Sequence, residues 1–333
     1  MLNMVSDLVD EMLITARSIK KMYGPHLALD DISLDIPHGA IGILGPNGAG
    51  KSTFFKCLLG LIKTTSGSGR VLGYDIRTEG ELIRSKIGYM PEYDSLDPGL
   101  TAIDQVRYSG ELLGMNPDAA TQRAHEVLQY VGLKDQRYRK IETFSTGMKQ
   151  AAKLACALIH DPEILICDEP TNGLDQRARE FMLQTLRKTV IEGGRSVLMS
   201  SHVMGDVETV CDSIVMIHKG KIVVHRSIDD MVKQVEKEIE ISVWGGASQM
   251  ESELSSRGLS VRRMGRNMRV TKVDEDTYTE ILSSAAKAGV QVRKMTEYEP
   301  DLEDIFLLIM DKLGEEVRET GELMTSDHTG EGL

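Results

Sequence analysis

Long apolar runs, clustered cysteines and clustered basic residues are all missing from this sequence. No run approaches the ~18 apolar residues of a membrane span, so we expect no helix that crosses a membrane. The four cysteines, at positions 57, 156, 167 and 211, form no C-x-x-C pair and no Cys/His cluster, which disfavours structural zinc and indicates buried thiols in a reducing compartment. The formal net charge is -12 without a block of Lys and Arg, so nucleic acid is not the expected partner.

The beginning of the chain also lacks the features of a signal peptide. Residues 1–12 carry acidic residues and no sustained apolar core, so we expect a loosely held extension there. With 333 residues, 41% of them hydrophobic, the chain can form a large domain and a smaller one. We therefore expect a cytoplasmic protein that reaches a membrane only through a partner.

The most informative stretch is GPNGAGKST at residues 45–53, which matches the phosphate-loop pattern G-x-x-x-x-G-K-[ST]. It lies between an apolar run, AIGIL, and a helix-like run, FFKCLLGLI. Glycines let main-chain N–H groups and the helix N-terminus face an anion, while Lys51 reaches the outer phosphates and Ser52 can ligate Mg²⁺. The pattern predicts nucleoside triphosphate binding, and the alternative is an ordinary glycine-rich turn. The residues concerned are Gly45, Pro46, Asn47, Gly48, Ala49, Gly50, Lys51, Ser52 and Thr53.

The segments around this loop predict an α/β domain. Residues 13–24 and 28–39 have the pattern of two antiparallel strands, and Tyr23 ends the first of them, where its ring can stack on a base or simply pack. The stretch TTSGSG, residues 64–69, is typical of a hydrophilic turn. From Thr101 to about Lys140 the apolar spacing is helical, which predicts a helical insertion between two halves of an α/β core.

Two carboxylates follow a strongly apolar run. EILIC, residues 163–167, suits a strand of a parallel sheet, which would deliver Asp168 and Glu169 to the carboxyl edge where ligands bind. Asp168 is suited to hold Mg²⁺ through water, and Glu169 to orient and deprotonate an attacking water. The next strand, SVLMSSH, ends in His202, which can contact a γ-phosphate or be purely structural. A solvated strand end is the alternative for the carboxylates.

Taken in their order along the chain, these motifs resemble those of the ATP-binding subunit of an ABC transporter over roughly residues 13–225. The resemblance comprises the aromatic Tyr23, the Walker A loop, a Q-loop in IGYMPE, the signature FSTGMKQ, Walker B in ILICDE, a D-loop in NGLD and a switch histidine in SSHVMGDVE. It implies an ABC-type P-loop ATPase fold with an antiparallel β subdomain and a helical subdomain at about 96–160. FSTGMK and YMPE resemble the ABC-2 branch, which includes daunorubicin-resistance exporters.

The resemblance also implies the roles of further residues. Two subunits would face head to tail and enclose each ATP between one phosphate loop and the partner's signature, here Ser145 and Gly147, with Asp175 at the interface. Glu92 stands where the family has glutamine; it can still ligate Mg²⁺ but cannot donate a hydrogen bond. Thr146 replaces the first glycine of the usual signature. The expected partners are a separately encoded ABC-2 permease and a second copy of the chain, and the expected cofactors are ATP and Mg²⁺.

After the ATP-binding domain, predicted at 13–236, a βαββαβ order over residues 237–313 predicts a small ferredoxin-like α+β domain. Docking or dimer stabilisation and small-ligand regulation both stay open as its role. A last helix would carry Leu302, Ile305, Phe306 and Ile309 on one face, and the acidic, glycine-dotted residues 314–333 are expected to be disordered. The main functional hypothesis is an ATPase subunit that drives export. Its rivals are a soluble ABC ATPase acting as a mechanical switch on a cytosolic complex and a subunit unable to hydrolyse ATP.

Overall fold

The computed structural model describes residues 12–234, 237–265, 267–274 and 276–298, together with residues 302, 304 and 305. These residues form two compact units that divide after Ile228, while the sequence predicts the boundary after residue 236. The extension before residue 12, the tail after residue 313 and the Phe306 and Ile309 positions of the expected last helix lie outside the described residues.

The first unit begins with an antiparallel sheet in the order β2-β1-β4-β5. Its strands are β1 (Met12–Tyr23), β2 (His26–Pro37), β4 (Ser66–Val71) and β5 (Tyr74–Asp75). The expected turn over TTSGSG is wrong from Ser66 onward, because these small residues pair with β1 as part of β4. A Cβ on Gly67 would lie 2.2 Å from the carbonyl oxygen of Ser18, so the two backbones approach too closely for a side chain. Glycine in this strand therefore marks close packing rather than a turn.

A second, six-stranded sheet has the order β10-β9-β3-β8-β7-β6. It is parallel from β9 to β6, and β10 pairs antiparallel with β9 at one edge. The interior strands β3, β7 and β8 are buried along their whole length, which explains their continuous apolar sequences. The strands are β3 (Ala40–Leu44), β6 (Ile87–Met90), β7 (Ile164–Asp168), β8 (Ser196–Ser201), β9 (Ser213–His218) and β10 (Lys221–Ser227).

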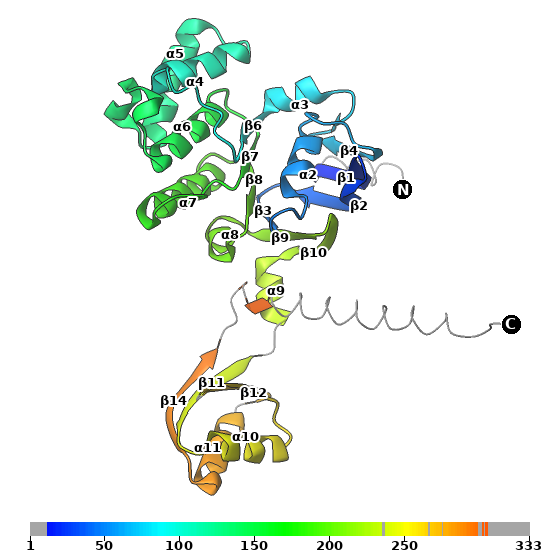
Figure 1. Cartoon of the computed structure of the whole chain (residues 1–333), viewed down its shortest axis with the longest axis vertical. Coiled ribbons are helices and arrows are strands. Elements are labelled where there is room, and N and C mark those ends of the chain that lie inside the picture. The colour runs from blue at the N-terminus through cyan, green and yellow to red at the C-terminus, as the bar shows by residue number, and fades with distance from the viewer. Residues whose placement is uncertain are drawn as a thin grey trace, which may run out of the picture. The chain divides into compact units, whose positions relative to one another are not determined.

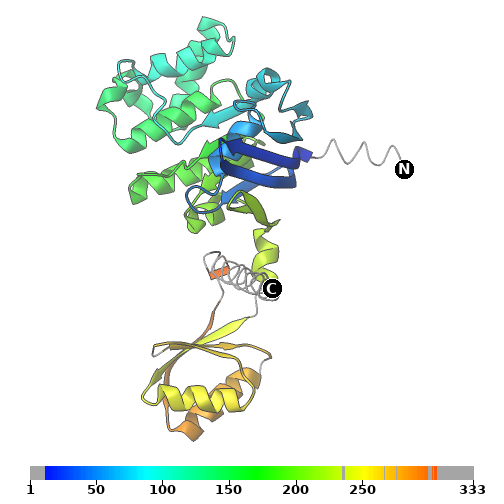
Figure 2. The same cartoon turned by 45° about the vertical axis from the view of Figure 1, so that its right-hand side comes forward.

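The helices that connect these strands lie in different places around the two sheets (Figure 1). In the views of Figures 1 and 2, α4, α5 and α6 lie together on one side of the parallel sheet, and the antiparallel sheet lies on the other. Helix α2 packs between the two sheets, where Phe54 and Phe55 join one core with residues of both. The bounds are α2 (Lys51–Leu58), α3 (Gly80–Lys86), α4 (Ala102–Leu112), α5 (Pro117–Tyr130), η1 (Lys134–Tyr138), η2 (Ile141–Thr143), α6 (Thr146–Leu158), α7 (Gln176–Ile191), α8 (Met204–Val210) and α9 (Ile228–Gln234).

Side-chain caps fix the beginnings of the long helices. Thr101 accepts a hydrogen bond from the Asp104 N–H at the start of α4, and Asn116 caps α5, whose first residue is Pro117. Not every apolar position of the insertion is internal, because Leu112 and Leu113 at the end of α4 are exposed. The helical subdomain that the sequence predicts is therefore present, with two of its apolar residues at the surface.

The second unit is a four-stranded antiparallel sheet in the order β12-β13-β11-β14. Both of its helices lie on the same face of this sheet (Figures 1 and 2). Apolar residues such as Ile241, Met250, Val270 and Ile281 fill the space between sheet and helices. The elements are β11 (Glu238–Trp244), α10 (Ala247–Ser256), β12 (Val261–Met264), β13 (Asn267–Thr271), α11 (Asp276–Ala288) and β14 (Gln291–Tyr298). The connectivity is the ferredoxin-like βαββαβ arrangement that the sequence predicts.

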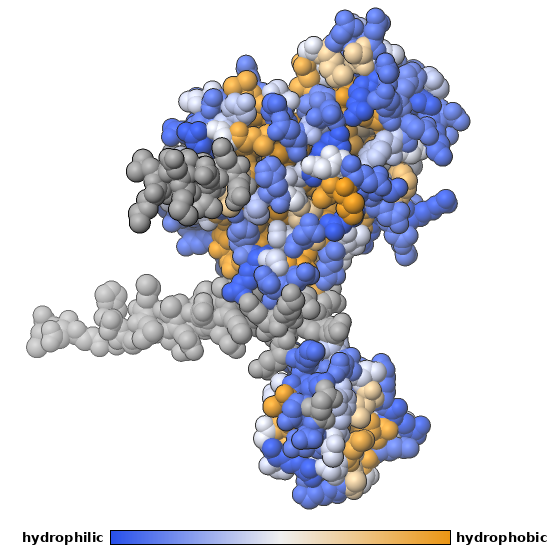
Figure 3. Space-filling view, turned by 180° about the vertical axis from the view of Figure 1, so that it is seen from behind, coloured by the Kyte–Doolittle hydropathy of each residue, from blue (hydrophilic) through white to orange (hydrophobic). Residues whose placement is uncertain are grey.

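The described helices include none with the length and hydropathy that a bilayer-spanning helix requires. On the face of the molecule drawn in Figure 3, hydrophobic residues of the first unit lie in several small groups with hydrophilic residues between them.

Candidate functional site

The phosphate loop joins β3 to α2 with a backbone that only glycine tolerates at two positions. Gly45 has φ of 156° and Gly50 has φ of 111°. A Cβ on Gly45 would lie 2.2 Å from the Ile217 carbonyl oxygen, and one on Gly50 would lie 2.7 Å from that of Ala28. Gly50 is the N-cap of α2 and offers no side-chain acceptor to the first turn. The first N–H groups of the helix therefore face outward as donors for an anion.

Lys51, the first residue of α2, is buried at the mouth of this loop. Its Nζ donates to the carbonyl oxygens of Gly45, at 2.7 Å, and Pro46, at 3.4 Å. The same ammonium lies 3.4 Å from Oε1 of Glu169, which is also buried. Within the described residues, that oxygen accepts no well-oriented hydrogen bond. A buried charge pair with spare hydrogen-bonding capacity on the carboxylate is suited to receive a polar ligand.

One hydroxyl on the neighbouring strand contacts both residues at the end of β7, the carboxylate of Asp168 and the main chain of Glu169. Ser200 of β8 donates from Oγ to Oδ1 of Asp168 at 2.6 Å, and the same Oγ accepts the N–H of Glu169 at 2.9 Å. Glu169 has φ of 50°, an uncommon conformation for a residue with a side chain. Ser200 therefore holds the backbone turn that separates the directions of the two carboxylates.

His202 follows β8 and contacts the same carboxylate from the other side. Its Nδ1 lies 2.8 Å from Oε2 of Glu169. Glu169 thus lies between a lysine at one oxygen and a histidine at the other. The histidine is half exposed, so it is accessible to a ligand that reaches Glu169.

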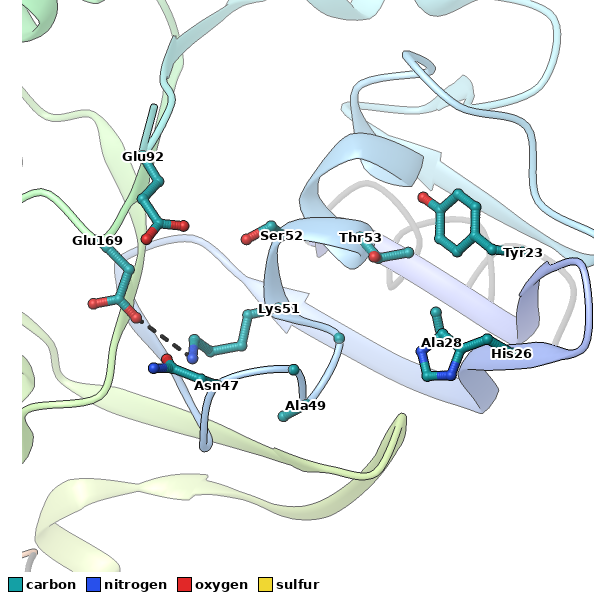
Figure 4. A pocket seen from close by; sticks show the side chains of 12 residues that line it. Tyr23, His26, Ala28, Asn47, Ala49, Lys51, Ser52, Thr53, Glu92 and Glu169 are labelled. Carbon is teal, nitrogen blue, oxygen red and sulfur yellow. Dashed lines mark ion pairs between the residues drawn. The ribbon is translucent and has the colours of Figure 1, made fainter. Parts of the chain in front are cut away.

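One cavity of about 390 Å³ extends from Lys51 and Glu169 to the first β-hairpin, and Asp168, Ser200 and His202 are not among the residues that line it. Figure 4 shows Tyr23 and His26 at one end and Glu92 and Glu169 at the other, with Lys51 directed towards Glu169. The cavity is polar at its carboxylate end and has ring and methyl groups at the hairpin end. Its lining residues are Tyr23, His26, Ala28, Asn47, Gly48, Ala49, Gly50, Lys51, Ser52, Thr53, Glu92 and Glu169.

The loop after β6 that carries Glu92 is held from helix α6. Nζ of Lys153 donates to the carbonyl oxygens of Pro91, Glu92 and Tyr93 at 2.7, 3.0 and 3.3 Å. Burial lowers the pKa of Lys153 below its usual value, and nearby carboxylates, Asp94 first among them, oppose that change. The carboxylate of Glu92 accepts a hydrogen bond of 3.5 Å from the Asn172 amide.

The remaining predicted residues form a second cluster that does not line the cavity. Ser145 caps α6 and accepts the N–H of Met148, and Asp175 caps α7 and accepts that of Ala178. Gly147 packs against the first turn of α7, since a Cβ there would lie 3.0 Å from Cβ of Ala178. The signature and the D-loop are therefore neighbours at the N-termini of two helices. We call Ser145, Gly147 and Asp175 the signature cluster.

Sequence reasoning did not identify His26, Ser200 or Lys153. His26 pairs with Tyr23 across the hairpin turn, so the predicted hairpin itself pointed to it. Ser200 and Lys153 are polar residues within otherwise apolar segments, and such residues are buried at a cost unless they have partners. A polar residue inside an apolar segment could therefore have pointed to Ser200 and Lys153, although the pattern does not show which groups they contact.

Comparison with known proteins accounts for this arrangement. Residues 29–172 match the family model described as ABC transporter. The linearmycin resistance ATP-binding protein of Bacillus subtilis is 35% identical over 312 residues, which cover 89% of this chain and 97% of the relative. The chain belongs to the family of ABC transporter ATP-binding proteins.

Other relatives agree with this assignment. The daunorubicin/doxorubicin resistance ATP-binding protein of Streptomyces peucetius is 28% identical over 303 residues, covering 89% of this chain and 92% of that protein. A solved dimeric ATP-binding cassette in a post-hydrolysis state, bound to ADP and phosphate, has a TM-score of 0.60 at 26% identity and covers 64% of this chain and 98% of its own. The relatives are consistent with the ABC-2 branch that FSTGMK and YMPE indicate.

As a member of this family, the chain is an ABC ATP-binding subunit, which binds ATP and couples ATP hydrolysis to transport. Such subunits dimerise and work with a transmembrane component. The predicted ABC-ATPase fold is confirmed.

Proposed function

We propose that this ABC subunit powers export through a separately encoded ABC-2 permease, by ATP-driven closure of a homodimer. The observation that carries the proposal is the separation of the two clusters in one chain. Residues of the phosphate loop, Glu92 and Glu169 line the cavity, whereas the signature cluster does not. A second copy arranged head to tail would bring its signature cluster to this cavity and complete the site.

In this proposal the cavity takes ATP with its base at the hairpin end. The exposed ring of Tyr23 stacks on the base, and Ala28 forms an apolar floor beside it. The phosphates lie on the N–H groups of the loop and of the first turn of α2, where Lys51 neutralises the outer phosphate charge. Lys51 exchanges its carbonyl partners for phosphate oxygens as the nucleotide enters.

Hydrolysis in this proposal uses Glu169 as the general base. Its carboxylate accepts a proton from water that attacks the γ-phosphate, and His202 fixes one carboxylate oxygen and contacts the γ-phosphate itself. Lys51 lies at the other oxygen, so the charge of the base stays close to the phosphates. The serine between the strands, Ser200, keeps Glu169 in its turned conformation.

Mg²⁺ fits the donors at the carboxylate end of the cavity, because the Ser52 hydroxyl and the Glu92 carboxylate both line it and hard oxygen ligands are what Mg²⁺ prefers. We propose these two as ligands, with Asp168 acting through water. When bound, the ion neutralises charge that develops on the phosphate oxygens.

The export direction and the permease are proposed from the relatives. The Bacillus and Streptomyces proteins are named for resistance to linearmycin and to daunorubicin/doxorubicin, which favours movement of cargo out of the cell. The chain would then lie on the inner face of the cell membrane, held there by the permease. Purification of the native chain from gently solubilised membranes tests this part. We expect a multi-span protein in stoichiometric amount; recovery only from the soluble fraction would favour a switch acting on a cytosolic complex.

Closure of the dimer is tested by sedimentation with Mg²⁺ and a slowly hydrolysed ATP analogue. We expect the mass to rise from 36.9 kDa to twice that value on addition of the analogue. A chain that stays monomeric at micromolar concentration with saturating analogue would contradict closure by the isolated subunit.

A further inference from the structure

Lys153 is a buried ammonium on α6 that, within the described residues, donates its hydrogen bonds to uncharged carbonyl oxygens. It is 5% exposed, and its three hydrogen bonds go to the consecutive carbonyl oxygens of residues 91, 92 and 93. An ammonium has three N–H donors, so its hydrogen-bonding capacity is fully used. Burying such a charge costs free energy, and a hydrophobic residue of similar size is often no less stable at such a place. The cost indicates a role other than packing.

The three carbonyls flank the residue that lines the cavity. Glu92 is the middle residue of the three, and its side chain lies at the carboxylate end of the cavity (Figure 4). Its carbonyl oxygen accepts a hydrogen bond from Lys153. The loop is thus fixed on its main-chain side and presents its carboxylate on the other side. The hydrogen bond that the Asn172 amide donates to the carboxylate is 3.5 Å long, which is longer than each of the three main-chain contacts with Lys153.

Helix α6 links this contact to the signature cluster. The helix is capped by Ser145 and contains Lys153 two turns further along. The residues between them belong to one continuous α-helix, whose turns are joined by hydrogen bonds from each N–H to the carbonyl oxygen four residues earlier. A displacement of the signature at its N-terminus would therefore displace the ammonium and, through it, the Glu92 loop.

We propose that Lys153 is a positioning residue for Glu92, which holds the Glu92 loop against α6 and transmits movement of the signature helix to the nucleotide site. The inference rests on the proposed function in assigning Glu92 to Mg²⁺. It does not depend on the permease or on the direction of transport.

The chain offers a matched control on the same helix. Lys149, one turn before Lys153, also contacts this loop, but through an ion pair of 2.8 Å with the side chain of Asp94 and with one third of its own side chain exposed. Lys149→Met therefore removes an ammonium from the same face of α6 without removing a main-chain contact. Exposed ion pairs contribute little to stability.

The first experiment is hydrogen–deuterium exchange of the full chain without nucleotide. In Lys153→Met we expect exchange of the Leu96 and Asp97 amides, whose acceptors are the side chains of Asp94 and Gln105, to rise about tenfold or more, because the loop just before them loses its hydrogen bonds to a charged group. In Lys149→Met we expect less than about a threefold rise. Unchanged exchange in a folded Lys153→Met variant would overturn the proposal. If that variant does not fold, Lys153→Gln, which keeps two N–H donors, is measured instead; it has to show a larger rise than Lys149→Met, confined to the same segment, and a rise no larger than that of Lys149→Met would overturn the proposal.

The second experiment asks whether Lys153 acts through Glu92. Binding of a fluorescent ATP analogue is titrated with Mg²⁺ in Lys153→Met, Glu92→Ala and the double variant. We expect each single variant to need about tenfold more Mg²⁺ for half-saturation, and the double variant to need no more than Glu92→Ala alone. If the two substitutions raise the Mg²⁺ requirement additively in the double variant, the proposal that Lys153 acts through Glu92 would be overturned. If Glu92→Ala leaves the Mg²⁺ requirement unchanged, the assignment of Glu92 to Mg²⁺ in the proposed function fails. The hydrogen–deuterium exchange result still tests whether Lys153 holds the Glu92 loop.

Discussion

The two units of this chain cover a β-sheet with helices in similar ways, but they differ in what they bury. The ATP-binding unit buries charged side chains, among them Lys51, Lys153, Asp168, Glu169 and Asp206. In the described part of the second unit, the buried polar side chains are only Thr277 and Ser284, neither of which is charged. Because a buried charge is costly, the difference indicates that the candidate chemistry lies in the first unit.

Even inside the first unit, buried charges are of two kinds. Asp206 is fully paired, with the Thr171 hydroxyl at 2.5 Å and Nε of Arg179 at 2.6 Å, and it serves the structure. Glu169 is only partly paired and lines the cavity. Incomplete pairing next to a cavity is therefore the feature that distinguishes the catalytic candidate.

The largest expected effect on ATP turnover comes from Glu169→Gln. The amide cannot accept the proton of water, so kcat should fall by roughly 10²- to 10⁴-fold while ATP still binds. Steady-state hydrolysis and equilibrium nucleotide binding measure the two parts. Glu163→Gln is the control, since Glu163 precedes the same strand but pairs with Lys86 at the surface. Hydrolysis by Glu169→Gln at the wild-type rate would show that the base lies elsewhere.

A smaller effect is expected from Ser200→Ala, which removes the hydroxyl shared by Asp168 and Glu169. We expect kcat to fall roughly tenfold and the free energy of unfolding to fall by about 1–3 kcal/mol, because two buried groups lose a partner. The control is Ser201→Ala, which removes a hydroxyl that accepts a hydrogen bond from the Val203 N–H. Equal losses of kcat in both variants would remove the special role of Ser200.

Tyr23→Ala should change binding rather than chemistry. Loss of stacking on the base should raise KM for ATP about tenfold and leave kcat within about twofold. Kinetics at varied ATP separate the two parameters. Tyr108→Ala, an exposed tyrosine on α4, is the matched control. A fall in kcat without a change in KM would place Tyr23 outside the base contact.

The smallest effect on turnover is expected from Ile241→Ala in the core of the second unit. The variant should lose about 2–5 kcal/mol of stability in that unit, because a fully buried side chain is shortened. Hydrolysis should stay within about twofold of the wild-type rate. Ser242→Ala, on the next residue of β11, controls for the strand. Loss of hydrolysis in step with the unfolding of the second unit would show that the two units do not differ as described.

Sequence patterns predicted most of this fold, because each element carries a local signal. The continuous apolar runs of β3 and β7, the caps of α4 and α6 and the glycines of the phosphate loop all have a local physical cause. The second unit was predicted for the same reason, since its strands and helices alternate clearly. The turn over residues 64–69 was wrong because its glycine content reflects contact with β1, which a local pattern does not reveal.

The site was predictable to the extent that its motifs are contiguous. Lys51, Ser52, Asp168 and Glu169 follow directly from motifs placed at strand ends. Ser200 and Lys153 did not, because their partners lie 31 or more positions away in the chain and meet them only through sheet pairing and helix packing. Roles that the family resemblance implied for Ser145, Gly147 and Asp175 stay predictions, since a single chain does not contain the site that they would complete.

The central claim is that a second copy completes the site, and mixing two inactive variants tests it most directly. Lys51→Met disables the phosphate loop. Ser145→Arg places a bulky cation at an exposed signature position that does not line the cavity of the same chain. In a head-to-tail dimer of one variant with the other, one site is intact and the other carries both lesions. We predict that the equal mixture recovers roughly a quarter of the wild-type hydrolysis rate, while each variant alone is inactive. A mixture as inactive as its components would contradict the account.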